Sequence, residues 1–111
     1  MDSSLGMRAR VRVPFHRSII FGGDTFATEG VLLNLAVSGC AIQCSDIPRL
    51  EEYLQCAIFV GVCESVLIVD VAKVRWRQAG MFGVEFLRVN SDEQQRLGRL
   101  VDDHEAPRPQ W

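Results

Sequence analysis

The sequence predicts an all-β domain: a small closed antiparallel β-barrel of about six strands, followed by one C-terminal α-helix. Apolar residues recur at every second position from Val11 to about Val89, which is the period of half-buried β-strands. After Ser91 the spacing changes to three and four, which is the period of an amphipathic helix. Closure of the sheet is expected because strands this apolar would leave adhesive edges in an open sheet.

Three strands are predicted in the first half of the chain. Residues 15–21 alternate and lead to a turn at residues 22–24, after which residues 26–35 return as the second strand. Residues 40–44 alternate again and form the third strand. Pro48 then ends the ladder, because proline has no N–H to donate.

The remaining strands are predicted between residue 57 and residue 86. Residues 57–62 and 65–71 are expected to pair around a turn. The alternation changes phase near Ala72, which predicts a β-bulge that bends the strand. Residues 78–80 form a turn, and residues 82–86 alternate as the last strand.

The final element is a short capped helix. Ser91 and Gln94 have the spacing of a capping box, in which their side chains satisfy free backbone amides. Leu97, Leu100 and Val101 form an apolar stripe. A helix this short does not stand alone, so we expect it to pack on the sheet or to close one end of the barrel.

Length and composition indicate one soluble domain. The chain has 111 residues, of which 48% are hydrophobic and 23% are charged, enough for a single core. We expect a flexible segment at residues 1–7, the domain at residues 8–104 and a C-terminal tail at residues 105–111. No apolar run is long enough to span a bilayer, and residues 1–7 do not resemble a signal peptide, so we expect a cytoplasmic protein without membrane insertion.

The four cysteines favour buried, reduced thiols over a metal site. Cys40, Cys44, Cys56 and Cys63 lie in apolar stretches and lack the close pairing that zinc sites use. No paired carboxylates, activated nucleophile or phosphate-binding loop is evident either, so the sequence predicts neither an enzyme nor a resident cofactor.

Charge is distributed unevenly along the chain. The net charge is −2, whereas proteins that bind nucleic-acid polymers are usually strongly basic. Arg8, Arg10, Arg12 and Arg17 nevertheless fall within ten residues that contain no acid. Local positive charge on an acidic protein indicates one specific anion rather than a long polyanion.

Two short segments carry the candidate site. In an extended strand Arg8 and Arg12 face the same side, and their guanidinium forks match phosphate oxygens and the O6/N7 edge of guanine. Asn34 can donate to and accept from a base edge, while Gly39 allows a turn or the close approach of a ligand. Taken separately, each segment also fits an ordinary role, as a solvated basic strand or as a tight turn between strands.

Together these segments resemble the RxxxR and [DN]xSxxG signatures of the PilZ domain family. The order, the spacing and the flanking residues agree over about residues 8–102, including Val74-Arg75-Trp76 and the segment from Gly83 to Phe86. One position departs from the pattern, because Ala36 stands where the family usually has serine. The resemblance implies a six-stranded antiparallel barrel that binds cyclic di-GMP.

The resemblance also implies roles for individual residues. Arg8 and Arg12 would grip guanine and phosphate, and Asn34 and Gly39 would mark the ends of the second motif. Alanine at position 36 removes one hydrogen bond, worth on the order of 1 kcal/mol, and so weakens binding.

Two neighbouring residues complete the candidate set. Ser38 is a possible substitute donor for the hydroxyl missing at position 36. Arg10 has the opposite parity to the two motif arginines, so we expect it to be solvated.

The function that the sequence predicts is a non-catalytic cyclic di-GMP receptor. Binding of the ligand would order residues 1–12 against the turn at residues 34–39 and create a surface for an effector protein. The alternative is a PilZ-like protein–protein interaction module that does not need the nucleotide. Single-stranded nucleic acid is a weaker third option, which the acidic balance disfavours.

Overall fold

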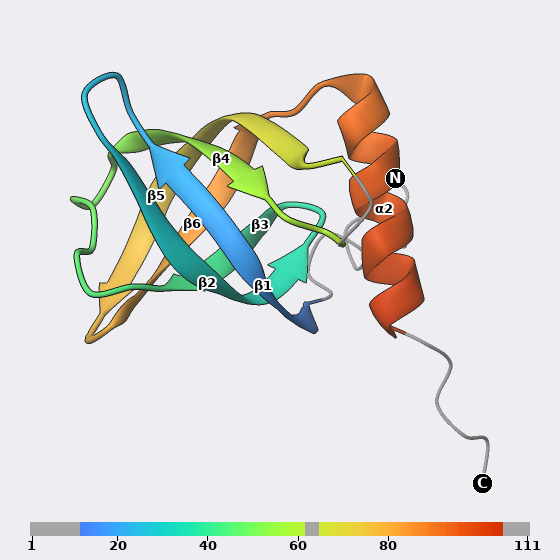
Figure 1. The fold of residues 1–111 in the computed structure, drawn as a ribbon, viewed down its shortest axis with the longest axis horizontal. Helices are drawn as coiled ribbons and strands as arrows, with labels where there is room; N and C mark the ends of the chain where they lie inside the picture. Colours follow the sequence, from blue (N-terminus) through green and yellow to red (C-terminus); the bar gives the residue numbers. More distant parts are fainter. Residues whose placement is uncertain (1–11, 62–64, 106–111) are drawn as a thin grey trace, which may run out of the picture.

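The computed structural model describes residues 12–61 and 65–105, which form a closed six-stranded antiparallel barrel with one helix (Figure 1). The strands are β1 (Val13–Gly22), β2 (Ala27–Ala36), β3 (Gly39–Gln43), β4 (Tyr53–Ile58), β5 (Leu67–Gln78) and β6 (Met81–Arg88), and the helix is α2 (Ser91–Glu105). Around the barrel the strands follow the order β1-β2-β3-β6-β5-β4, so that β4 closes onto β1. The predicted fold class is confirmed.

Alternation of buried and exposed residues along the strands places the core inside this barrel. Ile19 and Phe21 on β1 are fully buried, whereas Ile20 between them points outward and is 38% exposed. Phe21 meets Phe82 of β6 across the interior in an edge-to-face contact, with ring centroids 5.1 Å apart. The period of two in the sequence therefore corresponds to side chains that alternate between the inner and the outer face of the barrel wall.

The fourth strand was predicted wrongly. It covers residues 53–58 instead of 57–62, and its partner begins at Leu67 and continues to Gln78 without a break. Leu54, Cys56 and Ile58 face the core, and the strand ends where Ile58 has paired with both β1 and β5. The apolar character of residues 57–62 misled the prediction, because periodicity cannot show where pairing stops. The predicted turn at residues 61–64 lies mostly outside the described residues.

The bulge predicted near Ala72 is present. The register of β5 against β6 shifts between Val71 and Ala72, and it shifts again between Val74 and Trp76. After the second shift Trp76 lies on the outer face, although Val74 is fully buried. Two bulges in one strand of twelve residues give β5 the bend that closure requires.

Helix α2 begins one residue earlier than the predicted capping box. Asn90 is the N-cap, and its side-chain oxygen accepts hydrogen bonds from the backbone N–H groups of Asp92 (2.9 Å) and Glu93 (3.4 Å). The prediction of Ser91 as the cap is therefore wrong, since asparagine at position 90 satisfies the same free amides. The apolar stripe is confirmed: Leu97 and Val101 are buried against one end of the barrel.

Two charged side chains tie α2 to the start of β5. The Glu93 carboxylate accepts a hydrogen bond from the Ile68 N–H at 2.8 Å and pairs with Arg96 at 2.8 Å. Arg96 donates in turn to the carbonyl groups of Ser65 (2.6 Å) and Val66 (3.3 Å). The helix is thus held by hydrogen bonds as well as by its apolar stripe.

Candidate functional site

The start of β1 and the end of β2 lie side by side, which brings the last arginine of the first motif to the first residue of the second. Pro14 pairs with Asn34 across the two strands. The Arg12 guanidinium is exposed, and its Nη1 donates a hydrogen bond to Asn34 Oδ1 at 3.2 Å. Residues twenty-two positions apart in the chain therefore meet on the outer wall of the barrel.

The second motif forms the tight connection between β2 and β3. Ala36 pairs with Gly39, and Val37 and Ser38 make the turn between them. Ser38 is half-buried, and its carbonyl oxygen accepts a hydrogen bond from the Phe86 N–H at 2.8 Å. This bond extends the β3–β6 ladder into the turn and fixes the turn against its neighbouring strand.

Gly39 is required by the neighbouring strand. A Cβ atom at this position would lie 2.2 Å from the carbonyl oxygen of Val84 on β6, far inside contact distance. The residue has an ordinary negative φ among the described positions, so the turn itself does not demand glycine. The sequence interpretation offered a turn or the approach of a ligand, whereas the contact seen in the structure is the backbone of β6.

Ala36 is completely buried in the barrel wall. Arg8 and Arg10 lie outside the described residues. Of the predicted site residues, the structure thus brings together Arg12 and Asn34, with Ser38 in the adjoining turn and Gly39 at the start of β3.

The outer face continues from Asn34 across three further strands. Asn34 pairs with Ala41, Ala41 pairs with Gly83, and Gly83 pairs with Trp76. The Trp76 indole covers Gly83, where a Cβ atom would lie 2.1 Å from Nε1. Trp76 keeps 36% of its surface exposed, so it is a rim aromatic about three strand spacings, or ~14 Å, from Asn34.

Two cations of β5, Lys73 and Arg75, are already paired with carboxylates. Arg75 contacts Glu85 at 2.6 Å, and Lys73 contacts Glu51 at 2.9 Å. The hydrogen bond from Lys73 is the main cause that lowers the pKa of Glu51. Sequence reasoning missed this cluster because Glu51 reaches it from the β3–β4 loop, through a left-handed backbone with φ of 70°.

The described cysteines are poor ligands and nucleophiles. Burial raises the pKa of Cys56 to about 12 and raises that of Cys40 well above its usual value. The pKa of the Cys44 thiol is also raised, chiefly because burial removes water from it. Thiols of this kind stay protonated at neutral pH. Within residues 12–61 and 65–105, no group of acidic, histidine or cysteine side chains is arranged to hold a metal ion.

Among the residues that the structure describes, none of the helical segments has the length and apolarity that a bilayer crossing needs.

Comparison with known proteins finds one matching family model and similar solved structures. The PilZ domain model matches residues 7–103. The PilZ domain of CeSA from a cellulose-synthesizing bacterium superposes with a TM-score of 0.66 at 20% identity, covering 86% of this chain and 98% of its own. The Bacillus subtilis inhibitor of motility MotI/DgrA superposes with a TM-score of 0.68 at 17% identity, over 82% of this chain and 47% of its own. No curated protein matches the chain.

Proposed function

Since the chain belongs to the PilZ domain family, a family of cyclic di-GMP receptors, we propose that it is itself a receptor for cyclic di-GMP. PilZ domains are binding modules rather than enzymes. The site that we propose lies on the outer wall of the barrel, between Arg12 and the segment from Asn34 to Gly39, with Arg8 as a further ligand-binding residue. The observation that supports it best is the hydrogen bond from Arg12 to Asn34, which joins the two motifs.

The chemistry of these two side chains suits a guanine dinucleotide. A guanidinium carries five N–H donors, and the contact with Asn34 uses one N–H group of Arg12. The others can address phosphate oxygens or the O6/N7 edge of guanine. Asn34 retains its amide donors for a base edge. The ligand would then replace a weak exposed contact with charge-assisted hydrogen bonds.

Calorimetric titration of the full chain tests this function. Cyclic di-GMP should bind, and the titration also gives its stoichiometry. GTP should bind at least tenfold more weakly, because one mononucleotide cannot present two guanines and two phosphodiesters. Undetectable binding of cyclic di-GMP by the folded protein would reject the receptor function. That result would favour the alternative function, a protein–protein interaction module that does not need the nucleotide.

Restoring serine at position 36 should separate ligand binding from stability. In Ala36→Ser we expect cyclic di-GMP to bind about five- to tenfold more tightly, because one hydrogen bond contributes ~1 kcal/mol. Without ligand the buried hydroxyl should lower the free energy of unfolding by about 1 kcal/mol. Titration and chemical denaturation measure the two effects.

Ala72→Ser is the matched control, since Ala72 is also fully buried but its side chain belongs to the hydrophobic core of the barrel. It should lose stability without gaining affinity. An unchanged affinity in Ala36→Ser would show that position 36 does not contact the ligand.

Ordering of the N-terminal segment is the proposed signalling step. Residues 1–12 would be drawn against the turn at residues 34–39 when Arg8 and Arg12 bind the ligand, presenting a new surface to an effector protein. We expect amide hydrogen exchange of residues 1–14 to slow at least tenfold on addition of cyclic di-GMP. Equal exchange rates in the free and the saturated protein would contradict this step while leaving binding itself intact.

A further inference from the structure

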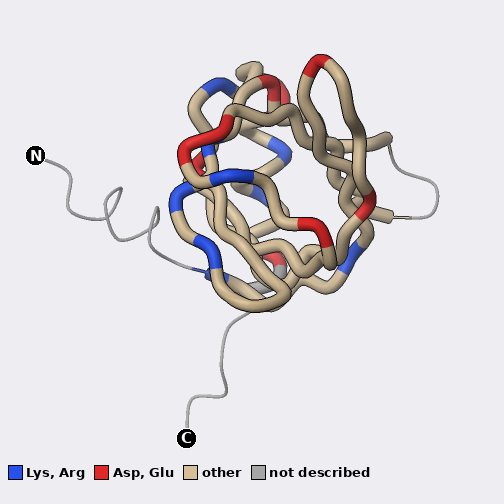
Figure 2. Tube along the Cα trace, turned by 90° about the vertical axis from the view of Figure 1, so that its left-hand side faces the viewer, with Lys and Arg blue, Asp and Glu red and all other residues tan. Residues whose placement is uncertain are grey.

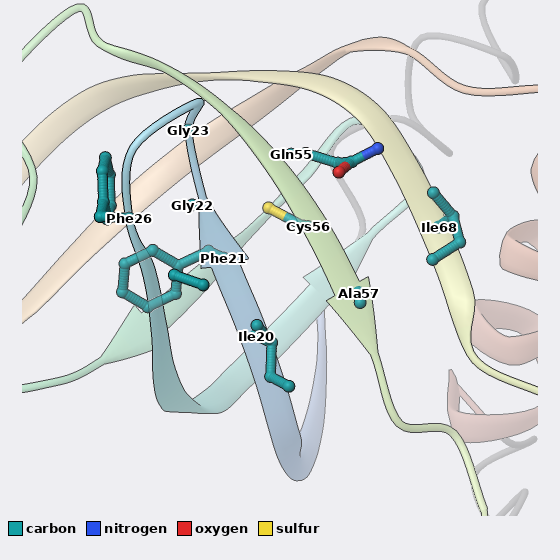
Figure 3. A pocket seen from close by; sticks show the side chains of 10 residues that line it. Ile20, Phe21, Gly22, Gly23, Phe26, Gln55, Cys56, Ala57 and Ile68 are labelled. Carbon is teal, nitrogen blue, oxygen red and sulfur yellow. The ribbon is translucent and has the colours of Figure 1, made fainter.

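The outer face of β1, β4 and β5 contains an apolar hollow. Ile20, Ala57 and Ile68 form one row across the three strands, since Ile20 pairs with Ala57 and Ala57 pairs with Ile68. Together with Phe26 from the β1–β2 hairpin they line a cavity of about 170 Å³ that opens to solvent (Figure 3). A volume of this size accepts one large apolar side chain, since a cavity of ~150 Å³ holds a benzene ring.

Large apolar side chains are exposed here although the strands are paired on both edges. Ile20 is 38% exposed, Phe26 is 37% exposed, and Phe59, which follows β4 directly, is 38% exposed. A second hollow of about 310 Å³ shares Gly22, Gly23 and Gln55 with the first. The two hollows therefore adjoin at the junction of β1 and β4, and we call the pair a groove.

The groove is framed by acidic side chains. Asp24 and Asp70 line the second hollow, and Glu29 pairs with Ile20 on the opposite side of the first. None of these three carboxylates forms an ion pair with any residue in the described part of the chain, whereas Glu51, Glu85 and Glu93 all do. Among residues 12–61 and 65–105, no Lys or Arg lines either hollow. Figure 2 shows the acidic tip of the upright β1–β2 hairpin, with most basic positions on the other side of the barrel.

We propose that this groove, called the β1–β4 groove below, docks a basic amphipathic helix of a partner protein. One large apolar residue of that helix would fill the hollow between Ile20 and Ile68. Lysine or arginine residues on its flanks would face Asp24, Asp70 and Glu29. A closed barrel offers no free strand edge for strand addition, whereas an exposed apolar groove suits the apolar face of an amphipathic helix.

The β1–β4 groove is separate from the nucleotide site. Ile20 lies seven residues along β1 from Val13, which corresponds to roughly 20–25 Å. Docking is therefore tested without nucleotide, and its failure would leave the proposed cyclic di-GMP site untouched.

The experiment uses the full chain and a labelled model peptide of about 15 residues, built from leucine and lysine with an amphipathic helical pattern. Fluorescence anisotropy measures its affinity, and amide chemical shifts locate it. We expect micromolar binding, with shifts concentrated at Ile20, Gly23, Gln55 and Ala57. A peptide with glutamate in place of lysine, and a scrambled peptide of the same composition, should each bind at least tenfold more weakly.

Two protein variants test the location. Asp70→Lys should weaken binding of the leucine–lysine peptide by about fivefold. Asp103→Lys makes the same charge change on an exposed residue of α2 and should leave binding unchanged. Asp70→Asn, which introduces no new charge, should give an intermediate loss if Asp70→Lys fails to fold.

Three outcomes would overturn the proposal: equal binding of the lysine and glutamate peptides, chemical shifts that cluster at Arg12 and Asn34, or equal affinities for the two Asp→Lys variants. A concentration-dependent dimer in sedimentation that protects Ile20 would also overturn it, because the groove would then bind a second copy of this chain.

Discussion

Replacing Gly39 with alanine is expected to lower the free energy of unfolding by about 3 kcal/mol or more. The new Cβ atom would lie 2.2 Å from the Val84 carbonyl oxygen, and backbone cannot move aside as a flexible side chain can. The strand pair would have to separate at the point where Ser38 bonds to Phe86. Chemical denaturation measures the loss, and the same variant should bind cyclic di-GMP poorly because the turn is displaced.

Two other glycines provide the comparison. Gly23→Ala meets mainly the Phe26 side chain at 3.3 Å and should cost less than about 1 kcal/mol. Gly80→Ala meets nothing within 4 Å, but its φ of 78° imposes a backbone penalty of about 1–2 kcal/mol. If Gly39→Ala proved as stable as Gly23→Ala and lost only ligand affinity, Gly39 would be a ligand contact and not a packing requirement.

Reversing the charge of both motif arginines is expected to abolish binding of cyclic di-GMP. Each guanidinium contributes a charge-assisted hydrogen-bonding group worth about 1.5–3 kcal/mol, so Arg8→Glu/Arg12→Glu should weaken binding by more than about 100-fold. The barrel should stay folded, because Arg12 is exposed and its hydrogen bond to Asn34 lies on the surface. Calorimetric titration measures the affinity, and thermal unfolding verifies the fold.

The matched control is Arg49→Glu/Arg99→Glu, which changes the net charge equally at exposed positions in the β3–β4 loop and on α2. It should retain its affinity for cyclic di-GMP to within about twofold, because salt screens the interaction between the ligand and distant exposed charges. Equal losses in the two double variants would mean that net charge, and not the motif, attracts the ligand. Arg12→Lys should bind more weakly than the parent chain, because lysine keeps the charge but loses the planar fork.

Substitutions in the proposed nucleotide site and in the β1–β4 groove should act independently. Arg8→Glu/Arg12→Glu should leave binding of the leucine–lysine peptide to the β1–β4 groove unchanged, and Asp70→Lys should leave cyclic di-GMP binding unchanged. This pair of results would assign one ligand to each end of β1.

Much of the fold was predictable because each strand has one buried face. Ile19 and Phe21 alternate with Ile20, and Leu97 and Val101 follow the helical period, so their side chains report burial directly. The bulge near Ala72 was predictable for the same reason, since an inserted residue reverses the alternation. The cap was predicted one residue late, because Asn90 and Ser91 are both good caps and only the geometry distinguishes them.

The candidate site was predictable only in part. The types of residue at Arg12 and Asn34 indicated a phosphate and guanine ligand, but their contact depends on the register of β1 against β2. The packing role of Gly39 and the apolar groove beside Ile20 had no signal in the linear pattern, because the partners lie far away in the chain: Val84 is 45 residues from Gly39, and Ala57 is 37 residues from Ile20.

The sequence by itself determined the class of fold, the positions of most turns and the chemical character of the two motifs, since these depend on local period and residue type. The tertiary structure decided the limits of β4, the pairing of Arg12 with Asn34, the need for glycine at position 39 and the grouping of Asp24, Glu29 and Asp70 around an apolar groove. The physical reason is that barrel closure sets the register between strands, and register decides which distant side chains share a face.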